Sequence, residues 1–85
     1  MKYDEMLVHR ITDLCNERNY SINYLATISG VSHSTLDSIM HGSSQNPKLK
    51  TIHRIALAFN MTLSEFLDYE EFNEYSFEDE EEIDS

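Results

Sequence analysis

The stretch that most constrains the fold runs from Ser21 to Gly42, SINYLATISGVSHSTLDSIMHG. Its first half predicts a short helix, because its inward positions recur at the helical spacing i, i+3, i+4 and i+7. Ser21 precedes this helix, and a serine side chain can accept a hydrogen bond from a free amide of the first turn. Gly30 ends it, since glycine readily adopts the left-handed backbone that terminates helices. The inward positions are Ile22, Leu25, Ala26 and Ser29.

The second half of the stretch predicts another short helix, which begins after Ser32 and ends before Gly42. Leu36 and Ile39 form its inward pair, spaced i and i+3. Two short helices joined by a tight turn that contains glycine form a helix-turn-helix. The residues that point away from the core are polar: His33, Ser34, Asp37, Ser38 and His41.

At these positions the chain resembles the Cro/phage-repressor-like helix-turn-helix family, also called the XRE family. The resemblance covers about residues 4–67, and an unrelated helical bundle with a chance glycine turn is the alternative. It implies an all-α, five-helix lambda-repressor-like domain that binds double-stranded DNA. The matching residues are Leu25, Ala26, Gly30, Val31, Ser32, Thr35, Ile39, Gly42, Asn46 and Pro47.

Apolar spacing and capping signals place the other helices. A first helix is expected from about Asp4 to Arg18, with Asp4 as its cap and Leu7, Ile11, Leu14 and Cys15 facing the core. A fourth is expected from about Leu49 to Phe59, with Leu49, Ile52, Ile55, Ala56 and Phe59 on its apolar side. Thr62 and Glu65 form a capping box that opens a short fifth helix with Leu63, Phe66 and Leu67 inside. Asn19 and Asn60 are expected to take left-handed exits.

The chain has 85 residues and a formal net charge of −10, which is unusual for a DNA-binding protein. The charge is concentrated at one end. Residues 1–67, the expected helix-turn-helix domain, carry six bases and six acids, whereas residues 68–85 carry ten acids and no base. Attraction to phosphates is therefore expected to be modest, and residues 68–85 are predicted to form an acidic, aromatic C-terminal tail.

Three roles remain open for this tail. Its end is expected to be disordered and solvated, because it holds five consecutive acids. It could instead cover the DNA-facing cations of its own chain, around Lys48, Lys50, Arg54 and His41. Tyr69 and Phe72 could also extend the last helix and bury aromatic surface at a dimer seam.

The family resemblance implies that the second helix of the motif, about residues 33–41, lies in the major groove as the recognition helix. Its candidate base contacts are His33, Ser34 and Ser38, followed by Asp37. These side chains discriminate weakly between bases, since no arginine or bidentate amide stands among them. A polar solvent-exposed face is the alternative. The candidate phosphate contacts are Ser21, at the start of a helix, and the flanking Ser32, His41, Ser43, Gln45 and Lys48.

Cys15 and Met40 stand where some phage repressors of the family carry an arginine and an acid. Apolar residues can replace such a buried pair, so both are expected to be buried close to each other, with Cys15 unreactive. The histidines have no metal-ligand spacing with a third ligand in register, and no catalytic constellation is evident. We therefore expect neither a metal, a cofactor nor an enzyme. Without an apolar segment long enough to cross a membrane or a signal-peptide core, and with one cysteine, the chain is expected in the cytoplasm.

These observations predict a sequence-specific transcriptional regulator, specifically a repressor, that binds double-stranded DNA. The family resemblance implies that it binds as a homodimer on a two-fold-related operator. The alternative is a protein-interaction module or an antitoxin-type regulator, whose acidic tail binds a partner protein.

Overall fold

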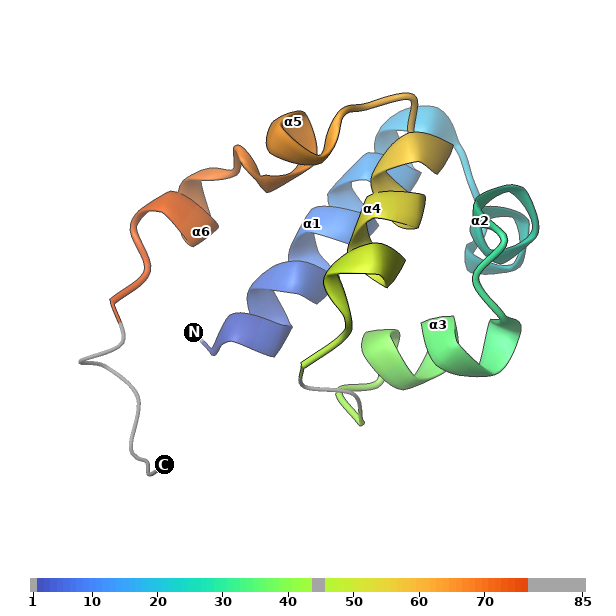
Figure 1. Ribbon diagram of the computed structural model, residues 1–85, viewed down its shortest axis with the longest axis horizontal. Helices are drawn as coiled ribbons and strands as arrows, with labels where there is room; N and C mark the ends of the chain where they lie inside the picture. The colour runs from blue at the N-terminus through green and yellow to red at the C-terminus, as the bar shows by residue number, and fades with distance from the viewer. Residues whose placement is uncertain (1, 44–45, 77–85) are drawn as a thin grey trace.

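Six helices follow one another in the part of the chain that the computed structural model describes, residues 2–43 and 46–76 (Figure 1). The all-α prediction is confirmed, and each of the five predicted helices is present. A sixth, of one turn, follows them within the stretch that was predicted as tail. The helices are α1 (Tyr3–Arg18), α2 (Ile22–Ser29), α3 (His33–Met40), α4 (Leu49–Ala58), α5 (Leu63–Leu67) and α6 (Glu70–Asn73).

Local side chains begin three of these helices, as the sequence predicts. Each capping side chain accepts a hydrogen bond from an amide of the first turn that has no partner within the helix. Ser21 accepts from the Tyr24 amide at 3.0 Å, and Ser32 accepts from the Thr35 amide at 3.1 Å. At α5 the capping box is complete, because Thr62 accepts from the Glu65 amide at 3.1 Å and its own amide donates to Glu65 Oε1 at 2.8 Å.

Left-handed residues end the helices where the sequence places them. Asn19 follows α1 with φ 58°, Gly30 follows α2 with φ 75°, and Asn60 stands after α4 with φ 62°. Asparagine tolerates this conformation better than most residues with a side chain, which explains its use at two of these exits. The chain therefore turns sharply after each helix, and short connections suffice.

Two details of the prediction are wrong, the cap of α1 and the burial of Leu49. The cap of α1 is Lys2 rather than Asp4, because Glu5 accepts a hydrogen bond from the Lys2 amide at 2.7 Å and the helix starts at Tyr3. Leu49 was expected on the buried side of α4 but is 63% exposed. It lies in the first turn, at the edge of the apolar stripe, where its side chain borders a surface hollow instead of the core.

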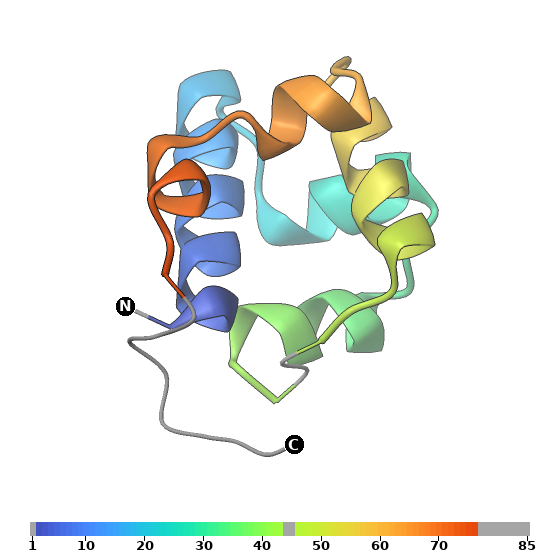
Figure 2. The same cartoon turned by 60° about the vertical axis from the view of Figure 1, so that its left-hand side comes forward.

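The core lies among α1 to α5, and α2 packs against both α3 and α4 (Figure 2). Phe59 is fully buried within it. Its ring stacks on Tyr20 with centroids 5.8 Å apart and on Phe66 with centroids 6.5 Å apart. The other buried members are Leu7, Ile11, Leu14, Cys15, Leu25, Ala26, Val31, Leu36, Ile39, Ile52, Ile55, Ala56 and Phe66.

Arg10 on α1 joins the C-terminal helices to the core through hydrogen bonds and a ring contact. Its Nε donates to the Phe66 carbonyl and its Nη2 to the Glu65 carbonyl, both at 2.9 Å. The guanidinium also lies over the Tyr69 ring, 5.0 Å from the centroid. Arg10 therefore provides a donor for the Phe66 carbonyl and a second donor for the Glu65 carbonyl, which also accepts from the Asp68 amide at 3.3 Å.

Helix α6 rests against α1 through side chains of both helices and of the preceding turn. Tyr69 donates its hydroxyl hydrogen to Asp13 Oδ2 at 2.7 Å, and His9 Nδ1 lies 3.4 Å from Glu71 Oε1. Burial, the hydrogen bond to Asp13 and the nearby carboxylates raise the pKa of Tyr69 to about 12. The Phe72 ring is partly buried against the core, so the stretch from Asp68 to Phe72 is held to the folded domain.

Cys15 is buried, as predicted, and Met40 is partly buried against the same core cluster. Met40 is thus less enclosed than the sequence suggests, because it is the last residue of α3 and lies at the rim. The proximity of the two side chains stays a prediction.

We expect Cys15 to react with a neutral thiol reagent at least tenfold more slowly than a cysteine placed at an exposed position such as Ser64. Burial raises the pKa of the Cys15 thiol, and the thiolate is the reactive form. Reaction of the native protein with a chromogenic disulfide measures the rate. Equal rates for Cys15 and the Ser64→Cys site would contradict the prediction.

Candidate nucleic-acid interface

The turn between α2 and α3 is anchored by small and apolar side chains. Val31 is 6% exposed, and Ala26 is 3% exposed on α2, which packs against α3. The alanine permits a close approach of the two helices because it adds only one methyl group. This packing holds α3 at the end of the molecule where α1 and α4 begin (Figures 1 and 2).

The polar residues of α3 and its cap form one continuous surface. Successive residues of a helix are about 100° apart around its axis. The four predicted base contacts and the phosphate candidate His41 therefore fall within an arc of about 140°, on the side opposite Leu36 and Ile39. Leu36 and Ile39 are buried, and Met40 beside them is partly buried. The structure therefore brings the predicted base contacts together. On this polar face His33, Ser34, Asp37 and His41 are exposed and Ser38 is partly exposed.

Hydrogen bonds within the motif restrict two of the candidate side chains. Ser32 Oγ donates to Thr35 Oγ1 at 2.8 Å, so its hydrogen reaches a phosphate only if the hydroxyl rotates. His41 Nδ1 lies 2.8 Å from the Asp37 carbonyl oxygen, which can only accept, so Nδ1 carries a hydrogen. In the neutral His41 ring Nε2 is then an acceptor, and it can donate to a phosphate only when the ring is protonated.

The phosphate candidates flank this face on both sides. Ser21 is exposed at the start of α2, and Ser43 is exposed just after α3, with its amide donating to the Ser38 carbonyl at 2.9 Å. Lys48 is exposed immediately before α4. Gln45 lies outside the described residues.

The start of α4 attracts anions through its backbone as well as through the cations Lys48, Lys50 and Arg54 that the sequence places there. The first amides of a helix lack partners within it, and the helix dipole is positive there. No side chain caps α4, and its first turn holds no acid. Lys50 and Arg54 are exposed on the same helix. The sequence Pro47-Lys48-Leu49 could have predicted this uncapped helix start, because it has no serine, threonine or aspartate at the cap position.

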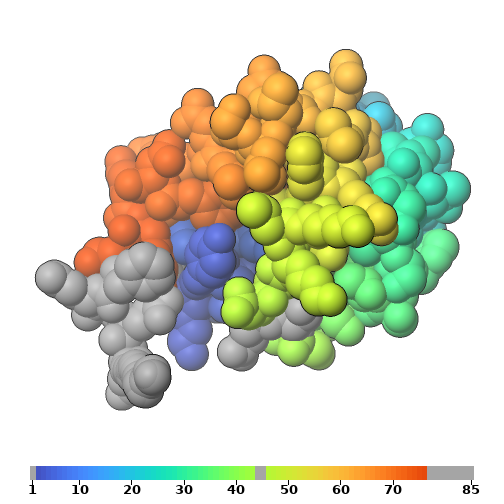
Figure 3. All heavy atoms as spheres, in the orientation of Figure 1, coloured from blue at the N-terminus to red at the C-terminus, as the bar shows by residue number. Residues whose placement is uncertain are grey.

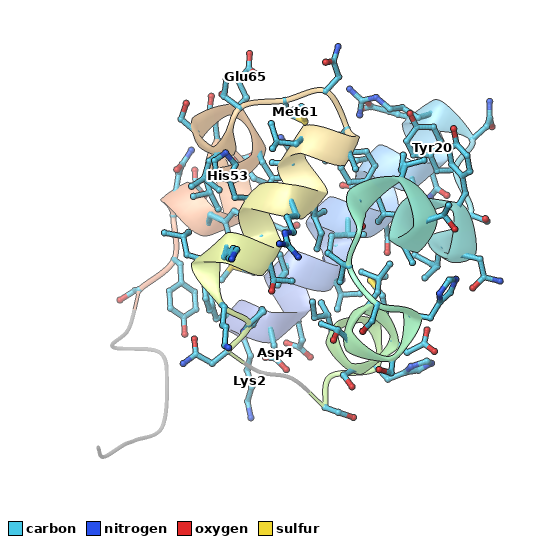
Figure 4. All side chains as sticks on the ribbon, turned by 45° about the vertical axis from the view of Figure 1, so that its right-hand side comes forward. Lys2, Asp4, Tyr20, His53, Met61 and Glu65 are labelled. Carbon is cyan, nitrogen blue, oxygen red and sulfur yellow. The ribbon has the colours of Figure 1, made fainter. Side chains whose placement is uncertain are left out.

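Two of the six basic side chains have structural roles. Arg10 binds the end of α5, and the Arg18 guanidinium lies 5.4 Å from the Phe59 ring centroid. The exposed bases of α4 and its cap, Lys48, Lys50 and Arg54, are therefore the main source of positive charge near α3. Figure 4 labels Lys2, which stands with Asp4 at the start of α1.

The chain matches the model of Cro/C1-type helix-turn-helix DNA-binding domains over residues 10–71. It is also 37% identical over 65 residues to the HTH-type transcriptional regulator SlrR of Bacillus subtilis (strain 168). That alignment covers 75% of this chain and 43% of the relative, so the chain spans less than half the length of that regulator.

The fold is similar to the crystal structure of the prophage Lp1 protein 11. The TM-score is 0.78 at 28% sequence identity, and the alignment covers 88% of this chain and 100% of the other. Within residues 2–43 and 46–76, no helix has the length and apolarity to span a membrane, and no group of three metal-ligating side chains occurs.

Proposed function

The chain belongs to the family of Cro/C1-type helix-turn-helix DNA-binding domains, and from this membership we propose that it represses transcription by placing α3 in the major groove of an operator. The observation that carries the proposal is the uninterrupted polar face of α3. An eight-residue helix is about 12 Å long, which matches a groove about 12 Å wide. Repression follows when the bound protein occupies DNA that the polymerase needs.

In the proposed complex, His33, Ser34, Asp37 and Ser38 face the bases. The backbone contacts come from Ser21, Ser32, His41, Ser43, Gln45 and Lys48. Two copies bind half-sites about one helical turn apart, because a two-fold operator matches a two-fold dimer. The proposal also places the protein in the cytoplasm, with access to DNA.

We expect selected operator sequences to depend on Ser34 and Ser38. Alanine at either position removes a donor and acceptor from the base-facing surface and should relax preference at one or two base pairs, each contributing about 1–3 kcal/mol. Selection of bound sequences from random DNA measures this change. The control is Ser64→Ala, which alters an exposed serine on α5 at the opposite end of the molecule (Figure 1).

Lys48→Ala should act differently, weakening binding to all sequences about equally. Loss of one phosphate contact should reduce the slope of log affinity against log salt by about 0.9. If the serine and lysine variants gave the same selected motif and the same salt slope, α3 would not be the recognition helix.

The second candidate is a protein-interaction module or antitoxin-type regulator. The observation that favours it is the ten acids and no base of residues 68–85, which suit a basic protein surface. Co-purification of a stoichiometric basic protein, released by salt, would support this function. Specific operator footprinting by the isolated protein supports the first.

A further inference from the structure

An apolar hollow lies on the surface between the start of α1, the start of α4 and α6. Its volume is about 270 Å³. Leu49 and Tyr3 border it and are 63% and 45% exposed, so apolar surface remains open to solvent. Figure 3 shows this face, with the first turns of α1 visible between α4 and α6. Its main lining residues are Tyr3, Leu7, Leu49, Ile52, Leu67 and Phe72.

One edge of this hollow is cationic. Leu49 lies between Lys48 and Lys50, both exposed, at the uncapped start of α4. His53 and Arg54 continue along the exposed side of the same helix, where Figure 4 labels His53. An occupant of the hollow that also reaches this edge is expected to combine an apolar side chain with several carboxylates.

The C-terminal end of the chain has this chemistry and begins beside the hollow. The Tyr75 ring lies 6.1 Å from the Tyr3 ring, and the Phe72 ring lies 5.9 Å from it, measured between centroids. After Ser76 the sequence continues as FEDEEEIDS, in which Phe77 precedes five consecutive acids. These nine residues can extend to about 30 Å, twice the roughly 15 Å length of α4.

We propose that residues 77–85 dock on their own chain, with Phe77 in the hollow and the acids Glu78–Glu82 along Lys48, Lys50 and the first turn of α4. The phenyl ring joins Tyr3 and Phe72, and it covers apolar surface that is otherwise exposed. The carboxylates meet the exposed ammonium groups and the unpartnered amides. Because the segment is tethered next to the site, its effective concentration is about millimolar.

Docking has a regulatory consequence that depends on the proposed function. Lys48 is a proposed phosphate contact, so the docked acids and the DNA backbone compete for the start of α4. A tail docked in two-thirds to nine-tenths of the molecules lowers the apparent DNA affinity about three- to tenfold. Salt weakens the charge contacts of the tail because it screens them.

The docking itself is tested without DNA, on full-length protein at low salt. We expect Phe77→Ala to shift the backbone amide NMR signals of Leu49, Ile52 and Phe72. In a second variant, the four glutamates of residues 78–82 are replaced by glutamine and Asp79 by asparagine. This neutralised tail should shift the amide signals of Leu49 and Lys50 in the same direction. The matched control is Ile83→Ala, an apolar change in the same segment that should affect only its sequence neighbours.

The proposal is overturned if Phe77→Ala also changes only its neighbours in sequence. It is also overturned if the shifts depend on protein concentration, because the occupant would then be the tail of a second copy. Neither result bears on whether the protein binds DNA.

The competition is tested separately with the selected operator. Phe77→Ala and the neutralised tail should bind about three- to tenfold more tightly than the unaltered protein at low salt, with the gain shrinking as salt rises. Ile83→Ala should leave affinity unchanged. Equal affinities for all four proteins would overturn the competition, whereas failure of all four to bind any DNA would overturn the proposed function.

Discussion

Replacing Phe59 by alanine is expected to lower the free energy of unfolding by about 3–5 kcal/mol. Its ring is fully buried and stacks on the rings of Tyr20 and Phe66, and the Arg18 guanidinium also lies over it. Truncation leaves a cavity and removes two stacked ring contacts together with the cation–π contact. Total stabilities are roughly 0.05–0.15 kcal/mol per residue, so this loss is a large share for 85 residues. Urea unfolding followed by circular dichroism measures the change.

Leu57→Ala is the matched control, two residues earlier in the chain. Leu57 is 61% exposed, so its truncation should change the unfolding free energy by no more than about 0.5 kcal/mol. Similar losses for the two variants would mean that the aromatic stack does not dominate the core.

Arg10→Met is expected to lower the free energy of unfolding by about 2 kcal/mol, since a hydrogen bond from a charged group contributes about 1.5–3 kcal/mol and partial exposure reduces this. The variant keeps an unbranched apolar side chain but loses both bonds to the α5 carbonyls and the contact with Tyr69. Amide hydrogen exchange should therefore accelerate most in residues 66–73. Denaturation and exchange experiments measure the two effects.

Arg10→Lys should not restore the attachment, because a single ammonium cannot supply the planar fork that meets two carbonyls. Arg54→Met removes an exposed arginine from α4 and should have little effect on exchange in α5 and α6. Uniform acceleration of exchange throughout the Arg10→Met protein would contradict a local role.

The helix ends were predictable because their causes are local. Ser21, Ser32 and Thr62 each cap an amide three residues away, and a single asparagine or glycine provides each left-handed exit. The role of Arg10 was not predictable from sequence, since its partners lie 55 and 56 residues away. From the sequence alone, Arg10 is indistinguishable from an exposed cation that could bind a phosphate group.

In the candidate site, too, the features with local causes were predictable from sequence and those built by distant segments were not. The polar face of α3 follows from helical spacing alone, because buried Leu36 and Ile39 fix which side faces outward. The apolar hollow beside Leu49 required three-dimensional information, since α1, α4 and α6 build it together. The DNA contacts of His33, Ser34, Asp37 and Ser38 stay a prediction.

The hydrogen bonds of Arg10 span most of the domain, so they can form only late in its synthesis. The Glu65 and Phe66 carbonyls that Arg10 binds are translated 55 and 56 residues after Arg10 itself. At about 5–20 residues per second, the delay is about three to eleven seconds. The helices between these partners can make contacts with their neighbours in that interval. The link between α1 and α5 therefore forms only after every helix between them has been translated.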